Sequence, residues 1–525
     1  MKVFRSILFV LVWLGALAAE IYATLRLWRL SVLPLKHKLI ICMILFTAWA
    51  IVGALFLFGS SAKKGRHPGF WRRLIAWVLT LALAFGSVYS TRVADQLDAT
   101  IQKVTETRTQ TTMIGVYVLV DDPAWELADA VDYTFGLSES YDAANERTAA
   151  SELRKTLGSI ETEEFDTVLD MVRALYDGEI GAMILNEAYT KILEEQDDYL
   201  TFSEDTRILY EIPIEEGDAA AVPVGTPQPI AEGEEESVVD YGNYDVQIEN
   251  FIPVNVTKEP FIVYLSGSDT RSRMLTTSLS DVNILVVVNP VTKQILLVNT
   301  PRDYYVANPA GGGAMDKLTH CGIYGIGCSV GALSNLYHMP VNYYAQINFT
   351  GFETLINALG GITIHSDYAF TMSHGKYQVV QGENHFNGIQ AVGYVRERYA
   401  FSTGDRQRGK NQMAVLTAVI NKLSTGTIIL HHSQILDSLQ GMFVTSLTAE
   451  EISDLVKMQL SDGADWNVRS FAVKGYDAGG YTYSMPGYVA YYMKQNADSI
   501  RQAVDLMQRV LNGETLTKED VSASD

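Results

Sequence analysis

Arginine and aspartate residues gather at three places in the C-terminal half of the chain, each directly after an apolar run that predicts a buried strand. Asp269 and Arg271 follow the first run, Arg302 and Asp303 the second, and Arg396 and Arg398 the third. Guanidinium groups match phosphate oxygens in pairs. Carboxylates are hard ligands that suit a divalent cation bridging phosphates. These residue types therefore predict a site that binds a pyrophosphate together with a metal ion.

Two further groups extend this candidate site. Asp281 stands at the start of the apolar run Val282–Asn289. Asp405, Arg408 and Gln412 precede a predicted helix over residues 413–423. Arg408 and Gln412 are four residues apart, so they share one face if the helix begins early.

A single arginine at a strand end is usually the partner of a surface salt bridge. Three strand-end clusters of the same composition, in a chain with a formal net charge of −21, instead favour an anion site. We expect the run Ala391–Val395 to be a strand. Alternation would then place Arg396 and Arg398 on one face, with Glu397 on the opposite face.

Strands and helices alternate around these clusters, which is typical of an α/β fold. The predicted strands are Phe261–Leu265, Val282–Asn289 and Gln294–Asn299. Ligand sites in open α/β sheets collect at strand ends. The sheet is therefore the element expected to bring the charged clusters together.

The region before this domain contains a second, smaller α/β pattern. Its predicted elements are strands at Met113–Val120 and Ile180–Leu185 and helices at Ala124–Thr134, Ala149–Leu157 and Glu164–Leu175. Residues 168–185 resemble part of a periplasmic solute-binding domain. The whole chain is predicted as transmembrane helices at 1–90, a helical stalk at 91–112, an accessory α/β domain at 113–212, an acidic proline-containing linker at 213–250, the larger domain at 251–512 and a disordered tail at 513–525.

The N-terminal ninety residues contain three apolar runs long enough to span a bilayer, namely Ile7–Leu25, Leu39–Phe58 and Leu74–Tyr89. The N-terminus and the second loop carry seven basic residues, and the first loop carries four. Basic residues favour the cytoplasmic side. We therefore expect a multi-pass protein of the cell membrane with a cytoplasmic N-terminus and extracytoplasmic C-terminal domains.

The net charge of the chain bears on its binding partners, and its cysteines bear on its redox compartment. A pI of about 4.9 argues against nucleic acid as a partner, because phosphate backbones require basic faces. The chain has three cysteines, and Cys42 lies in an apolar run. In an oxidising compartment Cys321 and Cys328 could form a disulfide, whereas in a reducing one they would remain thiols. With the topology above, we expect the disulfide.

The stretch from about Phe261 to Leu423 resembles the LytR-CpsA-Psr family of bacterial cell-wall ligases. The matching elements, in chain order, are Gly-Ser-Asp-Thr-Arg at 267–271, Pro-Arg-Asp at 301–303, Asp-Lys-Leu-Thr-His at 316–320, Val-Asn-Tyr-Tyr-Ala at 341–345, Phe-Thr-Gly-Phe at 349–352, Leu-Gly-Gly-Ile at 359–362, Arg-x-Arg at 396–398 and Gly-Asp-Arg at 404–406. The chain departs from the family at residues 280–283, Ser-Asp-Val-Asn, where many members have Arg-Ser-Asp-Thr. The nearest basic residue before this position is Arg273.

The resemblance implies an α/β domain with a central mixed sheet flanked by helices, and an enzyme. Family members transfer a glycopolymer, such as a teichoic acid or capsule, from a polyprenyl-pyrophosphate carrier to peptidoglycan at the bacterial cytoplasmic membrane. Mg²⁺ or Mn²⁺ is the implied cofactor, and hydrolysis of the pyrophosphate is an expected side activity. The competing hypothesis is an extracytoplasmic sensor that binds a lipid or a solute without catalysis.

The resemblance also assigns roles to residues. The implied metal ligands are Asp269 and Asp281. The implied pyrophosphate-binding residues are Arg271, Arg302, Lys317, Arg396, Arg398, Arg408 and Gln412. The residues expected to act in catalysis are Asp269, Asp281, Arg302, Arg398 and Asp405.

Overall fold

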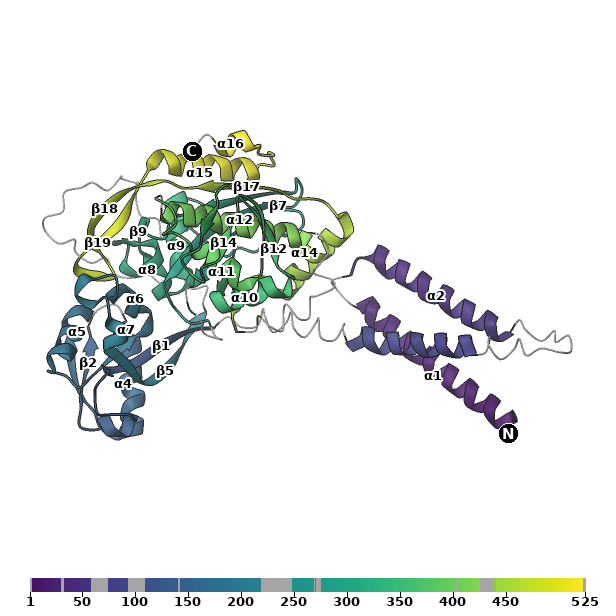
Figure 1. Cartoon of the computed structure of the whole chain (residues 1–525), viewed down its shortest axis with the longest axis horizontal. Coiled ribbons are helices and arrows are strands. Elements are labelled where there is room, and N and C mark those ends of the chain that lie inside the picture. The colour runs from purple at the N-terminus through teal and green to yellow at the C-terminus, as the bar shows by residue number, and fades with distance from the viewer. Residues whose placement is uncertain are drawn as a thin grey trace.

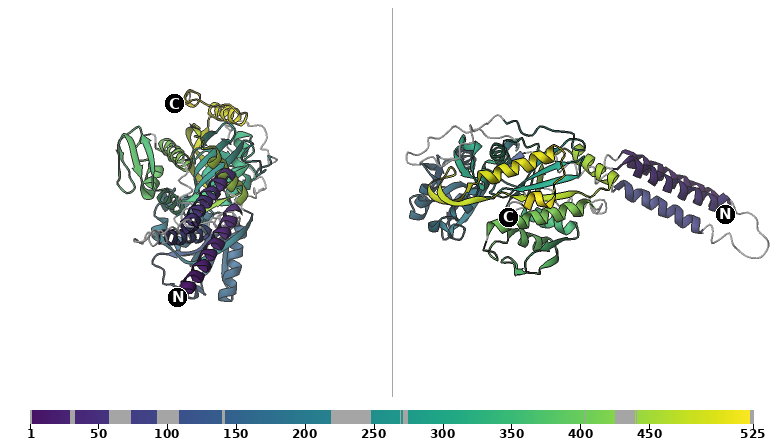
Figure 2. Two further views of the ribbon diagram at one scale, coloured as in Figure 1. Left: turned by 90° about the vertical axis from the view of Figure 1, so that its right-hand side faces the viewer. Right: turned by 90° about the horizontal axis from the view of Figure 1, so that it is seen from above.

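The structure is a computed structural model that describes residues 2–29, 33–57, 74–92, 109–139, 142–218, 248–268, 270, 275–402, 404–424, 439 and 441–522. The chain divides into a group of N-terminal helices, a small α/β unit and a larger α/β unit (Figure 1). The helices extend away from the two α/β units, as the right-hand view of Figure 2, seen from above, also shows. Most of the predicted stalk, residues 93–108, and of the predicted linker, residues 219–247, lies outside the described residues.

The N-terminal part consists of α1 (Lys2–Arg29), α2 (Leu35–Leu57) and a third helix over residues 74–92. Two helices in the described residues are long and apolar enough to cross a membrane, Leu35–Leu55 and Leu74–Arg92. The first predicted span lies within α1, which is not one of these two. Glu20 of α1 is buried and accepts a hydrogen bond from Ser87 of the third helix.

The small unit is built on a five-stranded sheet in the order β3-β2-β4-β1-β5. Its strands are β1 (Thr109–Leu119), β2 (Thr134–Ser138), β3 (Glu161–Phe165), β4 (Ala182–Asn186) and β5 (Thr206–Asp218). Helix α4 (Ala143–Leu157) packs on one face of the sheet and α5 (Val168–Asp177) on the other. The short helices α6 (Thr190–Leu193) and α7 (Phe202–Asp205) lie between β4 and β5.

Several boundaries of the small unit differ from the sequence prediction. The helix expected at residues 124–134 is only a 3-10 turn, Leu127–Ala130, after which the chain enters β2. The predicted helix from Glu164 begins instead at Val168, because the side chain of Thr167 caps the helix by accepting from the Asp170 amide. Strand β1 includes the end of the predicted stalk, and β5 continues into the predicted linker.

The larger unit has a central six-stranded mixed sheet in the order β16-β11-β6-β7-β8-β17. Its strands are β6 (Phe261–Ser268), β7 (Ser280–Asn289), β8 (Gln294–Asn299), β11 (Tyr343–Asn348), β16 (Phe443–Thr445) and β17 (Asn467–Ala472). Strands β6, β7 and β8 are antiparallel neighbours, whereas β11 pairs parallel to β6 and β17 parallel to β8. Strand β8 is buried along its whole length and β7 along most of it, because both faces of the sheet are covered at these strands.

Helices flank this sheet on both sides. One face packs against α9 (Ile326–Tyr337) and α15 (Ala497–Leu511). The other packs against α12 (Asp405–Ser424) and α14 (Ala449–Asp462). A further cluster joins α12 to α10 (Phe349–Ala358), α11 (Gly388–Arg396), β12 (Ile362–Ser366) and β15 (Gly382–Phe386).

The remaining elements of the larger unit lie outside its central sheet. They are β9 (Tyr305–Ala307), β10 (Met315–Lys317), α8 (Leu318–Cys321), the two-residue strands β13 (Phe370–Thr371) and β14 (Gln378–Val379), β18 (Gly475–Thr482), β19 (Met485–Gln495) and α16 (Lys518–Ser522). Helix α16 lies in the tail predicted to be disordered. Asp520 of this helix binds Arg509 of α15 at 2.9 Å, which holds the tail against the domain.

Candidate functional site

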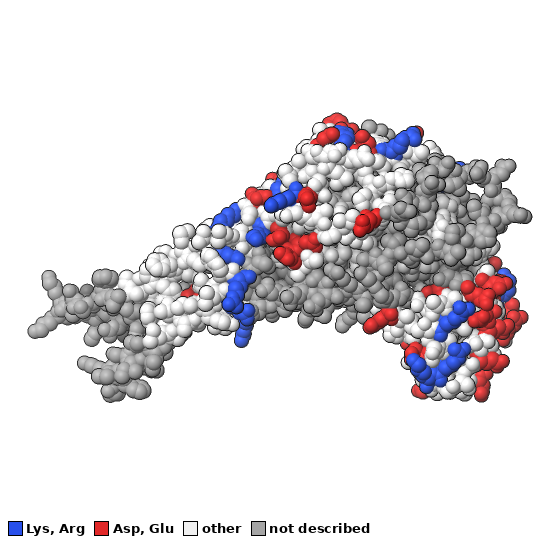
Figure 3. Space-filling view, turned by 180° about the vertical axis from the view of Figure 1, so that it is seen from behind, with Lys and Arg blue, Asp and Glu red and all other residues white. Residues whose placement is uncertain are grey.

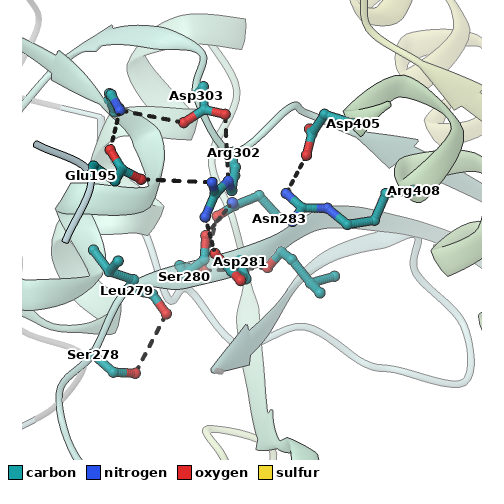
Figure 4. Close-up of polar contacts among 12 residues, drawn as sticks. Glu195, Ser278, Leu279, Ser280, Asp281, Asn283, Arg302, Asp303, Asp405 and Arg408 are labelled. Carbon is teal, nitrogen blue, oxygen red and sulfur yellow. Dashed lines mark hydrogen bonds and ion pairs between the residues drawn. The ribbon is translucent and has the colours of Figure 1, made fainter. Parts of the chain in front are cut away.

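The antiparallel order of β7 and β8 brings Asp281 and Arg302 together. Asp281 lies at the start of β7, and Arg302 follows the end of β8, which pairs with the same part of β7. Nη1 of Arg302 donates to Oδ1 of Asp281 at 2.9 Å (Figure 4). Asp281 and the strand-end cluster of Arg302 and Asp303 therefore meet at one end of the sheet.

A buried polar network holds the start of β7 behind Asp281. The hydroxyls of Tyr264 and Ser280 lie 2.9 Å apart, and Tyr264 donates to Oδ1 of Asn283 at 2.6 Å. Ser266 and Ser280 are joined at 2.8 Å. Because buried polar groups need partners, this network fixes the ends of β6 and β7 relative to each other.

Arg302 is surrounded by carboxylates. Besides Asp281, it contacts Asp303 at 3.4 Å and Glu195 of the small unit at 3.7 Å, and its side chain is only 16% exposed (Figure 4). Burial alone would lower the pKa of Arg302, but the charges of Asp281, Asp303 and Glu195 outweigh it and raise that pKa. The guanidinium therefore remains charged in its partly buried position.

The carboxylates respond to this cluster in opposite directions. Burial acts to raise the pKa of Asp281, but Arg302 and Arg408 overcome burial and hold that pKa below its ordinary value. In contrast, burial raises the pKa of Asp405, and Asp303 adds to the effect while Arg408 opposes it. One carboxylate is thus held ionised beside the arginines, and the other is poised to take up a proton.

The second half of the site comes from two helices. The sequence predicts a strand over residues 391–395, but in the structure these residues form the end of α11. This helix starts at a capping box between Asn387 and Gln390. Arg396 is the last residue of α11 and Arg398 follows it, so strand alternation does not set their directions. Glu397 points away and accepts from the amide of Ala400 at 3.0 Å.

Helix α12 begins at Asp405, earlier than predicted, and therefore carries Arg408 and Gln412 on its first turns. A close approach to β8 sets its position, because a Cβ on Gly409 would lie 2.5 Å from Oδ1 of Asn299. The Asn411 side chain donates to the carbonyl of Tyr394 at 3.2 Å and ties α12 to α11. These contacts bring the helix start to the arginines that follow α11.

The residues from both halves line one cavity of about 250 Å³. Its lining includes Asp281, Arg302, Arg396, Arg398, Arg408 and Gln412, together with Lys191, Glu194 and Glu195 of the small unit. Arg396 lies over the ring of Phe349 at 4.8 Å, and Arg398 donates to the hydroxyl of Tyr399 at 2.7 Å. The cavity therefore gathers Asp281 and most of the predicted pyrophosphate ligands.

Asp405 stands at the border of a second, larger cavity of about 1000 Å³. It forms an ion pair with Arg408, which lines the first cavity (Figure 4). The larger cavity also contains Tyr368 and Phe401, whose rings meet edge to face at 5.8 Å. A base at this position could act on a molecule that approaches from the second cavity.

Two predicted residues, Asp269 and Arg271, lie outside the described residues. Within the described part of the chain, no group of three or more His, Cys, Asp or Glu side chains is arranged to hold a metal ion. Mg²⁺ nevertheless commonly takes one or two carboxylates and completes its shell with water and substrate phosphates. Asp281, an ionised carboxylate on the cavity wall, fits such a shared site.

Lys317 is part of the cluster but not of the cavity wall. Its side chain is 3% exposed, and Nζ lies 2.6 Å from Oε2 of Glu195 and 3.7 Å from Oδ1 of Asp303. The neighbouring Asp316 is fully buried and binds His320 at 2.7 Å and Asn308 at 3.0 Å. In the motif at residues 316–320, Asp316 and His320 therefore stabilise the fold. Glu195 lies between Lys317 and the cavity.

Sequence reasoning missed Lys191, Glu194 and Glu195. They lie in an acidic stretch of the small unit that has the composition of a solvated surface. The signal that identifies them is tertiary, namely the packing of the small unit against Leu279, Ile323 and Met485 of the larger unit.

The expected disulfide between Cys321 and Cys328 is not present. Both residues are buried free thiols, and the Sγ of Cys328 lies 3.2 Å from Oδ1 of Asn308. Burial and the neighbouring Cys328 raise the pKa of Cys321, which favours the protonated thiol. Cys321 of α8 and Cys328 of α9 belong to the core between these helices and the large sheet.

Comparison with known proteins gives a consistent set of relatives. The model of the LytR_cpsA_psr family matches residues 231–504. A Bacillus cereus protein named polyisoprenyl-teichoic acid–peptidoglycan teichoic acid transferase TagU is 31% identical over 206 residues, which are 39% of this chain and 66% of that protein. The transferase TagT of Bacillus subtilis is 31% identical over 264 residues, 48% of this chain and 78% of that protein. The chain thus spans slightly less than two thirds of the length of TagU.

A solved structure of TagT bound to LIIa-WTA is also similar. It is 26% identical, with a TM-score of 0.42, and the match covers 56% of this chain and 100% of that one.

Proposed function

Because this chain belongs to the LytR-CpsA-Psr family, we propose that it transfers a glycopolymer from a polyprenyl-pyrophosphate carrier to peptidoglycan. The observation that supports this proposal is the cavity that Arg302, Arg396, Arg398 and Arg408 line together with Asp281. Arg302 and Arg408 have carboxylate partners, and Arg396 and Arg398 add two further positive charges to the same small space, which favours the binding of an anion there. A pyrophosphate supplies that anion, and the relatives TagU and TagT are named for polyisoprenyl-linked teichoic acid.

The proposed reaction is a phosphotransfer. A hydroxyl of peptidoglycan attacks the sugar-proximal phosphorus, a new P–O bond forms, and the bridging P–O bond to the polyprenyl phosphate breaks. The products are a phosphodiester between glycan and peptidoglycan and free polyprenyl phosphate. When water replaces the hydroxyl, the same steps hydrolyse the carrier, which is the proposed pyrophosphatase side activity.

Each side chain has a defined task in this scheme. Arg302, Arg396 and Arg398 bind the phosphate oxygens and stabilise the charge that develops on them. Asp405 accepts the proton of the attacking hydroxyl, because its raised pKa suits a base and it borders the larger cavity. Arg408 holds the Asp405 carboxylate in place through their ion pair.

Asp281, with Asp269 implied by the family resemblance, would hold Mg²⁺ or Mn²⁺. When bound, such an ion supplies neutralisation of charge on the pyrophosphate. Asp281 itself remains ionised because Arg302 contacts it at 2.9 Å, and it keeps that arginine directed at the cavity.

We further propose that all three N-terminal helices cross the membrane, with the N-terminus in the cytoplasm and both α/β units outside. The start of α2, directly after the loop that joins it to α1, touches the larger unit, where Lys36 of α2 donates to the carbonyl of Ser461. That loop and the catalytic unit therefore lie on one side. Basic side chains gather at this border (Figure 3).

The proposal is tested with the full-length protein in detergent, a polyprenyl-pyrophosphate-linked glycan, peptidoglycan and Mg²⁺, by measuring release of polyprenyl phosphate and attachment of glycan to peptidoglycan. Arg302→Ala and Arg398→Ala should each lower the rate by about 100-fold or more, since each removes a charged donor from the transition state. Lys155→Ala, on an exposed lysine of the small unit, is the matched control. Equal rates for the wild type and both arginine variants would overturn the proposal, whereas tight donor binding without turnover would favour the sensor.

A further inference from the structure

The small unit forms one wall of the anion cavity. Lys191 of α6 and Glu194 and Glu195 just after it line the cavity opposite the residues that follow α11. We propose that Lys191 is a further substrate-binding residue, which contacts the pyrophosphate of the donor and makes the small unit part of the active site. This inference rests on the proposed function and extends it to a second domain.

The charge balance of the cavity supports this role. Its described lining has five cations, Lys191, Arg302, Arg396, Arg398 and Arg408, and three carboxylates, Glu194, Glu195 and Asp281, so five minus three leaves a net charge of +2 with histidine neutral. A pyrophosphate esterified at both ends carries two negative charges. Lys191 contributes one of the positive charges that make the cavity lining cationic, in a chain whose total charge is −21.

Lys191 interacts electrostatically with the groups at the reacting end of the cavity. Partial burial lowers its pKa, Asp281 acts in the opposite direction, and Arg396 and Arg302 add to the lowering. Its side chain is nevertheless exposed to solvent, as a residue that meets an incoming substrate must be. A lysine ammonium is a compact point charge that suits phosphate.

The position of Lys191 is fixed by anchors on either side of it. Glu195 binds Lys317 at 2.6 Å, and its carbonyl accepts from the hydroxyl of Tyr488 at 3.3 Å. The hydroxyls of Tyr189 and Tyr324 lie 3.4 Å apart. These contacts join the segment that carries Lys191 to the larger unit before and after α6.

The two units also share a hydrophobic cluster. Ile192 and Leu193 of α6 pack in one cluster with Leu279, Ile323 and Met485 of the larger unit. Such a common core resembles the interior of one domain more than a transient contact between two. Lys191 is therefore a permanent part of the cavity wall.

The test is a steady-state comparison of wild type, Lys191→Ala and Lys191→Arg, with the full-length protein and a polyprenyl-pyrophosphate-linked glycan. Losing one charged contact made in the ground state should raise KM for the donor by about ten- to a hundredfold, with a much smaller change in kcat. The arginine variant should recover most of the loss. Lys155→Ala is the control, because Lys155 is an exposed lysine of the same unit.

A direct binding measurement accompanies the kinetics. Inorganic pyrophosphate, titrated calorimetrically into the full-length protein with Mg²⁺, should bind Lys191→Ala more weakly by a similar factor, while the melting temperature stays that of the wild type. Wild-type KM and pyrophosphate affinity in Lys191→Ala, together with an inactive Arg302→Ala, would overturn this inference and leave the proposed function intact. Activity unaffected in both variants would overturn the proposed function itself.

Discussion

The ion pair between Glu195 and Lys317 joins the two α/β units and can be broken with one substitution. Glu195→Gln removes the charge but keeps the size of the side chain. Lys317 is 3% exposed, so its ammonium would lose the partner at 2.6 Å and retain only Asp303 at 3.7 Å. The structure thus predicts a nearly buried cation with one distant counter-charge.

The magnitude follows from the geometry. With an effective dielectric constant of about 20, the attraction between unit charges is roughly 6 kcal/mol at 2.6 Å and roughly 4.5 kcal/mol at 3.7 Å. Breaking a buried pair typically costs about 3–5 kcal/mol. Because Glu195 is 29% exposed and Asp303 remains, we expect a loss of about 2 kcal/mol in the free energy that holds the units together. That corresponds to about 30-fold more frequent opening of the interface.

Hydrogen exchange measures this opening directly. The amide of Thr277 in the larger unit donates to the carbonyl of Thr111 in the small unit at 2.9 Å, so its exchange reports separation of the units. In full-length protein, Glu195→Gln should speed exchange at Thr277 by about 30-fold. Adding Lys317→Met should restore much of the protection, because it removes the unpaired charge.

Glu152→Gln is the matched control, since it breaks an exposed ion pair with Lys155 in the same unit. It should leave exchange at the interface unchanged. An exchange rate at Thr277 within twofold of wild type in Glu195→Gln would refute the reasoning.

Two further predictions concern pH. In the wild type, the transfer rate should rise with pH to values above the usual carboxylate range, because the pKa of Asp405 is raised. Asp405→Asn should lower the transfer rate by about 100-fold and abolish this rise. An unchanged pH–rate profile in this variant would exclude Asp405 as the base. Burial raises the pKa of Glu146 in the small unit from an ordinary 4.5 to about 8. The protonated side chain therefore stabilises the folded protein below pH 4.5, and this contribution, about 5 kcal/mol in the free energy of unfolding, is lost as the pH rises to 8. Glu146→Gln should therefore be more stable than wild type at pH 8 but not at pH 4.5, as measured by urea unfolding, and equal pH dependence of the two proteins would contradict this origin.

The central strands could be predicted from sequence because their composition leaves little choice. The run Gln294–Asn299 is β8 with the predicted bounds, and β7 extends the predicted strand by two residues. Continuous β-branched and aliphatic residues between turn signals are typical of a strand covered on both faces. The edge at which Asp281 and Arg302 meet follows from these strands.

Short apolar runs were predicted less well. Residues 391–395 are equally apolar in a strand or a buried helix, and their pattern alone does not distinguish the two. The capping box at Asn387 and Gln390 is the local signal that favours the helix, and it stands just before the run. In residues 124–134, apolar spacing suggested a helix where the chain instead joins the small sheet.

The contribution of the small unit to the site could not be predicted from the sequence. Lys191 and Glu195 are more than eighty residues from Asp281 along the chain and lie in a stretch with the composition of a surface helix. The packing of Leu193 and its neighbours against Leu279, with the ion pair of Glu195 and Lys317, brings them to the cavity. Lys191 can be identified as an anion-binding residue because it lies in the same cavity as arginines from other elements.

The central claim is that one phosphate of the donor becomes the bridge between glycan and peptidoglycan. The most direct measurement uses full-length protein in liposomes, a donor labelled with ³²P in the sugar-proximal phosphate, and peptidoglycan that is afterwards digested and analysed by mass spectrometry. We predict labelled phosphodiester on peptidoglycan, with released polyprenyl phosphate equal to the sum of that product and any labelled glycan phosphate formed by hydrolysis. Arg302→Ala should form both products at least about 100-fold more slowly. Release of polyprenyl phosphate with all label in water-soluble glycan phosphate, or label on peptidoglycan that Arg302→Ala produces at the wild-type rate, would contradict the account.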